Sequence, residues 1–124
     1  MSKIALAIIC LGTEDDSEKL KRCFDSVTKW VDAIYITFSG QKEEIKEAEK
    51  VCKEFKANVS YYNSTWTVTK QVYKWLTNYL RYEPHIEVGE KLFLFDEARN
   101  FNFSQIPKEY KWILWIDTDD VLVD

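Results

Sequence analysis

Apolar residues recur along the chain with two different spacings, and each spacing predicts a type of element. Continuous apolar runs at 4–11, 33–38 and 111–116 predict strands of a buried parallel sheet, and 58–62 predicts a shorter one. Apolar positions three and four residues apart predict two amphipathic helices between the first three strands. These positions are Leu20, Cys23, Phe24, Val27 and Val31 in the first helix, and Ile45, Ala48, Cys52 and Phe55 in the second. Strand, helix, strand, helix, strand predicts an α/β fold, a mostly parallel sheet with helices on both faces.

Residues 67–94 interrupt this alternation. They carry the apolar stripe of a further helix, ended by Glu83-Pro84, and we interpret the segment as a helical insertion into a single domain, 1–124. Another helix is expected at 96–105, before Pro107. Aromatic residues gather around the insertion, and they are typical of a core or interface more often than of a sugar-stacking platform. They are Tyr61, Tyr62, Trp66, Tyr73, Trp75, Tyr79 and Tyr82.

The charge of the chain bears on its partners. A formal net charge of −4 makes a nucleic-acid partner unexpected, because such a protein needs a basic face, and it disfavours binding to an anionic membrane surface for the same reason. No apolar stretch is long enough to predict a membrane span. Single, well-spaced cysteines at 10, 23 and 52 predict buried free thiols and a reducing, cytoplasmic location.

The strongest chemical signal follows the last strand. Asp117-Thr118-Asp119-Asp120 comes directly after the apolar run 111–116, and ligands of parallel α/β sheets bind at the carboxyl ends of strands. Carboxylate oxygens suit Mn²⁺ or Mg²⁺, which keep open positions for phosphate oxygens. If the strand continues, Asp117 and Asp119 face one side and Asp120 faces away. A solvated turn, with Asp119 and Asp120 capping the next element, is the alternative without a metal.

Two enzyme families resemble this acidic run. Four apolar residues followed by Asp-Thr-Asp-Asp-Val-Leu are similar to the first motif of haloacid-dehalogenase-like phosphatases, in which the first aspartate is the nucleophile. That motif opens the phosphatase fold, whereas here it lies at 117–122. The phosphatase is therefore the third hypothesis for function.

The second resemblance covers nearly the whole chain. The first strand with its acidic turn, the segments 20–27 and 30–36, Ala98-Arg99-Asn100 and the strand ending in Asp117-Thr118-Asp119-Asp120 follow one another in order. The chain resembles the N-terminal half of a family-2 glycosyltransferase. This resemblance implies a truncated, Rossmann-like GT-A fold and transfer of a sugar from a nucleoside diphosphate to an acceptor hydroxyl.

The resemblance also implies roles for individual residues. Asp119 would ligate Mn²⁺ or Mg²⁺, and Asp117 would contact the ribose or the metal. Arg99 would reach the nucleotide, with an ion pair to Asp96 or Glu97 as the alternative. Nucleotide-sugar contacts are also expected from Gly12, Thr13, Glu14 and Ser39. Ser39 or Thr37 would replace the aspartate that reads the base in this family, because Phe38 stands in its place.

The partners implied are a UDP-sugar, or a GDP-sugar as the second choice, and an unidentified acceptor. The acceptor half of the fold is not recognised in the chain, so no catalytic base is assigned. A nucleotide-sugar-binding module without turnover, completed by a partner, is therefore the second hypothesis. The edge of a half-built sheet also favours a homodimer.

Overall fold

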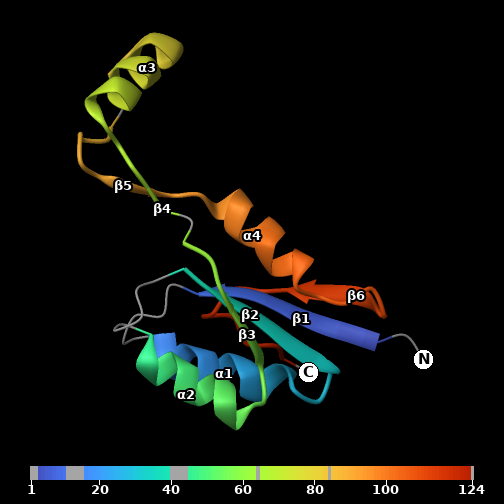
Figure 1. The fold of residues 1–124 in the computed structure, drawn as a ribbon. Helices are drawn as coiled ribbons and strands as arrows, with labels where there is room; N and C mark the ends of the chain where they lie inside the picture. Colours follow the sequence, from blue (N-terminus) through green and yellow to red (C-terminus); the bar gives the residue numbers. More distant parts are fainter. Residues whose placement is uncertain (1–2, 11–15, 40–44, 64, 84, 124) are drawn as a thin grey trace. The chain divides into compact units, whose positions relative to one another are not determined.

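A parallel sheet of four strands forms the centre of the fold in the computed structural model, which describes residues 3–10, 16–39, 45–63, 65–83 and 85–123 and, within them, not the side chains at 65–66 and 91–93. The strand order is β3-β2-β1-β6, and every neighbouring pair is parallel (Figure 1). The strands are β1 (Lys3–Cys10), β2 (Ala33–Phe38), β3 (Asn58–Tyr61) and β6 (Tyr110–Trp115). These bounds lie within one residue of the predicted ones; at the end of β1, the predicted residue 11 lies outside the described part.

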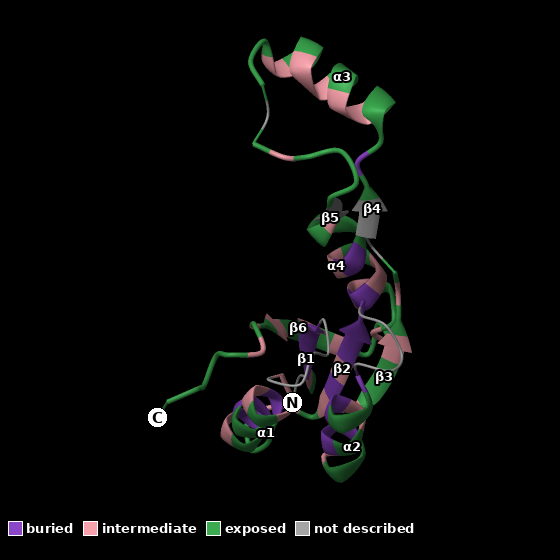
Figure 2. Cartoon of the chain, turned by 90° about the vertical axis from the view of Figure 1, so that its left-hand side faces the viewer, coloured by how far each residue is buried: buried purple, intermediate pink, exposed green. Residues whose placement is uncertain are grey.

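Helices cover both faces of this sheet. The helices α1 (Asp16–Val27) and α2 (Lys46–Glu54) lie on one face, and α4 (Phe95–Ser104) lies on the other (Figure 1). The core is on the α1 and α2 side, where the apolar stripes meet β1 and β2; Leu20, Phe24 and Ala48 are fully buried there. Figure 2 shows the buried residues concentrated in β1, β2 and the sheet-facing sides of the helices. The predicted α/β class with a parallel sheet is confirmed at this level.

The order of the strands reverses beside β1. The chain goes from β1 outward to β2 and β3, and later returns to add β6 on the other side of β1. In such sheets the crevice for ligands opens at the carboxyl ends of the two strands on either side of the reversal. Here those strands are β1 and β6. The residues that follow β6 are therefore placed at the expected binding edge.

Residues 64–95 form a separate unit, distinct from the unit made of 1–63 and 96–124. It contains α3 (Lys70–Leu80) between two short strands, β4 (Thr65–Thr67) and β5 (Lys91–Phe93), which pair in antiparallel fashion. The sequence predicts the helix but not the two strands, because runs of three residues carry no periodic signal. None of the helices in the described part of the chain has the length and apolar character needed to cross a bilayer.

Candidate metal centre

The acidic run lies in a turn that follows β6. The strand ends at Trp115, and Ile116 packs against the core with half-buried Leu114. The chain then turns: the Asp117 N–H donates to Oδ2 of Asp120 at 2.9 Å, and the Asp120 N–H donates to the Asp117 carbonyl at 3.0 Å. These two bonds hold the ends of the turn together.

The turn gathers three carboxylates. Asp117, Asp119 and Asp120 are all exposed, and each places one oxygen within 4.8 Å of the others. The prediction that Asp120 faces away is wrong, because it assumes an extended strand in which side chains alternate. In the turn, the carboxylate of Asp120 is directed back to the Asp117 amide. Sequence reasoning thus missed Asp120 as a member of the cluster.

The dimensions of this cluster fit a small divalent cation. An octahedral ion with oxygens at about 2.1 Å holds adjacent oxygens about 3.0 Å apart and opposite ones about 4.2 Å apart. The oxygens lie within 4.8 Å of one another, so they would have to move closer to reach that geometry, and the exposed side chains have room to do so. The all-oxygen donor set suits Mg²⁺ or Mn²⁺. Three adjacent negative charges also repel one another, and a cation relieves that repulsion.

Helix α1 anchors the turn from the core side. The Cys23 thiol donates weakly to the Asp117 carbonyl at 3.9 Å, and the Leu122 N–H donates to the Ser26 hydroxyl at 3.0 Å. Burial raises the pKa of the Cys23 thiol to about 11, and the charges of Asp120 and Asp119 add to the effect. Cys23 is therefore a protonated packing residue and no nucleophile at neutral pH, as the sequence predicts.

Arg99 reaches the same edge of the sheet from α4. Its guanidinium lies over the Trp115 ring, 5.5 Å from the centroid, and Trp115 is two residues before Asp117. The alternative ion pair with Asp96 is also present at 3.5 Å, but Asp96 is almost fully exposed, so this pair adds little stability. Arg99 thus lies against β6 close to where the acidic turn begins. A guanidinium in that position suits a phosphate or a base carbonyl.

Ser39 follows β2 at the carboxyl edge and is buried. Its N–H donates to the Cys10 carbonyl at 3.0 Å, while its Oγ has no hydrogen-bond partner among the described residues. Thr37, the other residue expected to contact the nucleobase, is already hydrogen-bonded within the protein. Its hydroxyl accepts from Asn102 Nδ2 at 2.9 Å and shares a hydrogen bond of 2.8 Å with the Ser60 hydroxyl. Of these two residues, Ser39 alone keeps a hydroxyl for a ligand within the described part.

Asn102 is a buried polar residue that the sequence analysis missed. Its Nδ2 donates to the Tyr35 carbonyl at 3.1 Å as well as to Thr37, which fastens α4 to β2. Asn102 is three residues, about one turn, beyond Arg99, so it fixes the helix that carries the guanidinium. A signal existed: Asn102 lies four residues after Ala98 and between two phenylalanines, and an asparagine on the buried face of a helix needs partners.

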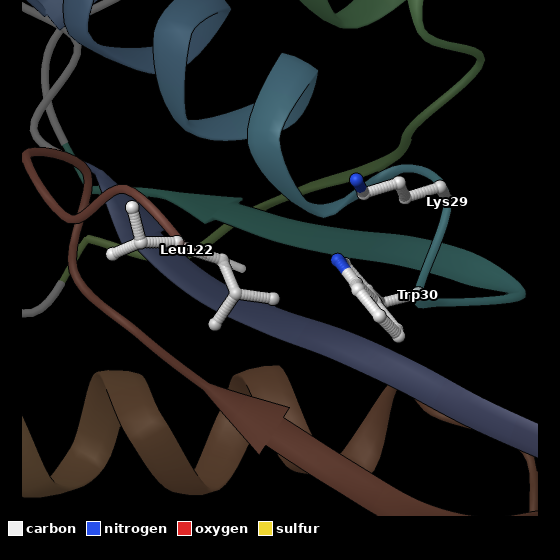
Figure 3. A pocket seen from close by; sticks show the side chains of 4 residues that line it. Lys29, Trp30 and Leu122 are labelled. Atoms are coloured by element: carbon white, nitrogen blue, oxygen red, sulfur yellow. The ribbon is translucent and has the colours of Figure 1, made fainter.

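Gly12, Thr13 and Glu14 lie outside the described residues, so their predicted contacts have no structural counterpart here. A hollow among the described residues lies elsewhere. It is an open space of about 690 Å³ whose described lining residues are Lys29, Trp30, Leu122 and Val123, none of which carries a carboxylate (Figure 3). The acidic turn is therefore not part of that hollow.

Comparison with protein families, with curated proteins and with solved structures gives no significant match. Function therefore has to be inferred from the residues of this chain.

Proposed function

We propose that the chain binds a nucleoside diphosphate sugar at the carboxyl edge of its sheet, through Mn²⁺ or Mg²⁺ held by Asp117, Asp119 and Asp120, and takes part in transfer of the sugar to an acceptor hydroxyl. The observation that carries the proposal is the cluster of three carboxylate oxygens within 4.8 Å, placed after β6 where the strand order reverses. The order of motifs that resembles family-2 glycosyltransferases and their GT-A fold supports the same function.

Each residue of the proposed site has a distinct chemical role. Asp119 and Asp117 supply oxygens to the cation, and Asp120 both supplies an oxygen and holds the turn through the Asp117 amide. Arg99, kept over Trp115, offers a fixed positive charge to a phosphate or a base carbonyl. Ser39 offers a buried hydroxyl at the end of β2, where a uracil or guanine edge is expected to lie.

When bound, the cation neutralises the negative charge of the departing diphosphate. The chain's own contribution is to hold donor atoms in place beforehand, so that little reorganisation is needed as charge develops. Arg99 would add a second positive charge from α4, the helix on the face of the sheet opposite α1 and α2. No residue of the described part is assigned as the base that deprotonates the acceptor, so the proposal covers donor binding and leaving-group stabilisation.

Calorimetric titration of UDP and of GDP, each with and without Mn²⁺, tests the proposal. We expect binding that requires the metal, favours UDP, disappears with EDTA, and weakens about tenfold or more in Asp119→Asn because one anionic ligand is lost. Asp25→Asn is the matched control: it removes the same charge from an exposed position on α1 and should leave affinity unchanged.

Equal affinity in Asp119→Asn and wild type would refute the site. Metal-dependent release of phosphate from an aryl phosphate, lost in Asp117→Asn, would favour the phosphatase instead. Binding without any transfer of the sugar to added acceptors would restrict the function to a nucleotide-sugar-binding module.

A further inference from the structure

Helix α3 is fully formed but buries none of its residues. The Thr69 hydroxyl caps its first turn by accepting from the Val72 N–H at 3.1 Å, and Arg81 closes its last turn in a left-handed conformation. Its largest side chains are exposed: Trp75 is 58% and Tyr79 73% accessible. Their rings stack at 5.4 Å with an interplanar angle of 11°, so they form one continuous aromatic surface.

The helix separates apolar from basic side chains. At about 100° per residue, its apolar and aromatic residues occupy an arc of roughly 160°. These residues are Val72, Tyr73, Trp75, Leu76, Tyr79 and Leu80. Lys70 and Lys74 lie one turn apart on the opposite side, and Arg81 follows at the carboxyl end. The aliphatic members are half-buried, whereas Trp75 and Tyr79, towards one border of the arc, are open to solvent.

The charge of this helix is opposite to that of the chain. Residues 70–82 contain Lys70, Lys74 and Arg81 and no acidic residue, although the whole chain carries a net charge of −4. The average therefore hides a local basic surface. The net charge of the chain disfavours anionic partners for the chain as a whole, but α3 carries the opposite charge.

We propose that α3 binds the surface of an anionic lipid bilayer, lying in the plane of the interface. Helices of this kind combine an apolar face carrying Trp or Leu with Lys and Arg on the polar face. Trp and Tyr suit the headgroup level because they are apolar in body and polar at one end. The bases add attraction to anionic headgroups of about fivefold in affinity per residue.

The charge distribution favours this occupant over two others. A second copy of the chain docked through the apolar arc of α3 would cover the stacked rings but would leave Lys70 and Lys74, on the opposite side of the helix, without groups of opposite charge. A neutral glycan would use the stacked rings but not the bases. The proposal goes beyond the proposed donor site and does not depend on it, since it involves residues 69–82 alone.

Flotation of the full chain with phosphatidylcholine vesicles, with and without about one third phosphatidylglycerol, tests this proposal. EDTA is present throughout, so that no divalent cation bridges the acidic turn to anionic lipids. We expect binding to the anionic vesicles only, weakened by raising the salt from about 0.1 to 0.5 M. Bromine-labelled lipid chains should quench the tryptophan fluorescence of the wild type and much less that of Trp75→Phe.

The double variant Lys70→Gln with Lys74→Gln should bind on the order of 20- to 30-fold more weakly. Lys21→Gln with Lys53→Gln is its matched control, since it removes the same charge from exposed positions on α1 and α2. Equal weakening in the two double variants, equal binding to neutral vesicles, or no binding at all would overturn the proposal. Self-association without lipid that is lost in Trp75→Ala would assign the surface to a second copy and would overturn it too.

Discussion

The two units of the chain obtain their structure in different ways. In the sheet unit, strands β1 and β2 bury nearly every side chain that faces α1 and α2, and residues far apart in sequence meet in one core. Among the side chains described in 65–95, Val68 alone is a buried hydrophobic residue. Helix α3 is defined instead by local bonds at its ends, the Thr69 cap and the Arg81 amide that donates to the Thr77 carbonyl.

Because of this difference, the residues that stabilise the fold are not the ones that α3 exposes to solvent. A core formed by distant residues unfolds cooperatively, whereas a short helix without buried residues opens locally at low cost. The sheet unit can therefore hold an acidic turn in a fixed shape, which a metal site requires. Helix α3 can expose Trp75 and Tyr79 because its structure does not depend on burying them.

The largest expected effect contrasts one aromatic residue from each unit. Phe24 is fully buried and packs edge-on against Phe55 at 5.4 Å, so Phe24→Ala should lower the free energy of unfolding by about 3–5 kcal/mol. Trp75→Ala removes a larger side chain but should change that free energy by less than about 0.5 kcal/mol. Urea denaturation followed by circular dichroism measures both. Similar losses in the two variants would mean that α3 contributes to the core as Phe24 does.

A smaller effect is expected from the buried thiol of Cys52 in α2. Burial raises its pKa from the ordinary value of 9.0 to about 12, and the charge of Glu49 adds to the shift. The unfolded thiol ionises above pH 9 while the folded one keeps its proton, so this stabilisation is complete below pH 9 and is lost as the pH rises towards 12. Between pH 8 and 10 the wild type should lose about 1.4 kcal/mol more stability than Cys52→Ala. Parallel pH slopes for the two proteins would contradict the assignment.

The sheet unit could be predicted from sequence because its pattern is strong. Continuous apolar runs and stripes at helical spacing identify β1, β2 and α2 within about a residue, since burial on the core side leaves few alternatives. The stripe predicted for the first helix runs to Val31, whereas α1 ends at Val27 and Val31 packs against the core beyond its end. In 64–95 the helix was predicted and the strands were not. Pairing of β4 with β5 depends on residues 24 to 28 positions apart in a ribbon three residues long, for which local pattern gives no sign.

The candidate site was predictable in composition but not in shape. The run after β6 indicates carboxylates at the sheet edge, yet the position of Asp120 depends on whether the chain extends or turns there. That choice is made by the hydrogen bond from the Asp117 amide and by the anchor from Leu122 to Ser26, which joins residues 96 positions apart. Asn102 was missed for a similar reason, because its partners Tyr35 and Thr37 lie on a distant strand.

The smallest expected effect is a local one, the loss of the helix cap of α3. Thr69→Ala removes the hydroxyl that accepts from the Val72 amide, and such caps are worth about 1 kcal/mol. If α3 is held locally, hydrogen exchange of amides 74–80 should speed up about fivefold, while exchange in β1 and the global midpoint of unfolding stay unchanged. Thr67→Ala, which removes an exposed threonine hydroxyl two residues earlier, is the control and should change neither. Faster exchange in β1 as well would mean that the two units unfold together. In that case the exposed aromatic rings of α3 would be coupled to the stability of the sheet, and the separation of surface from core would not hold.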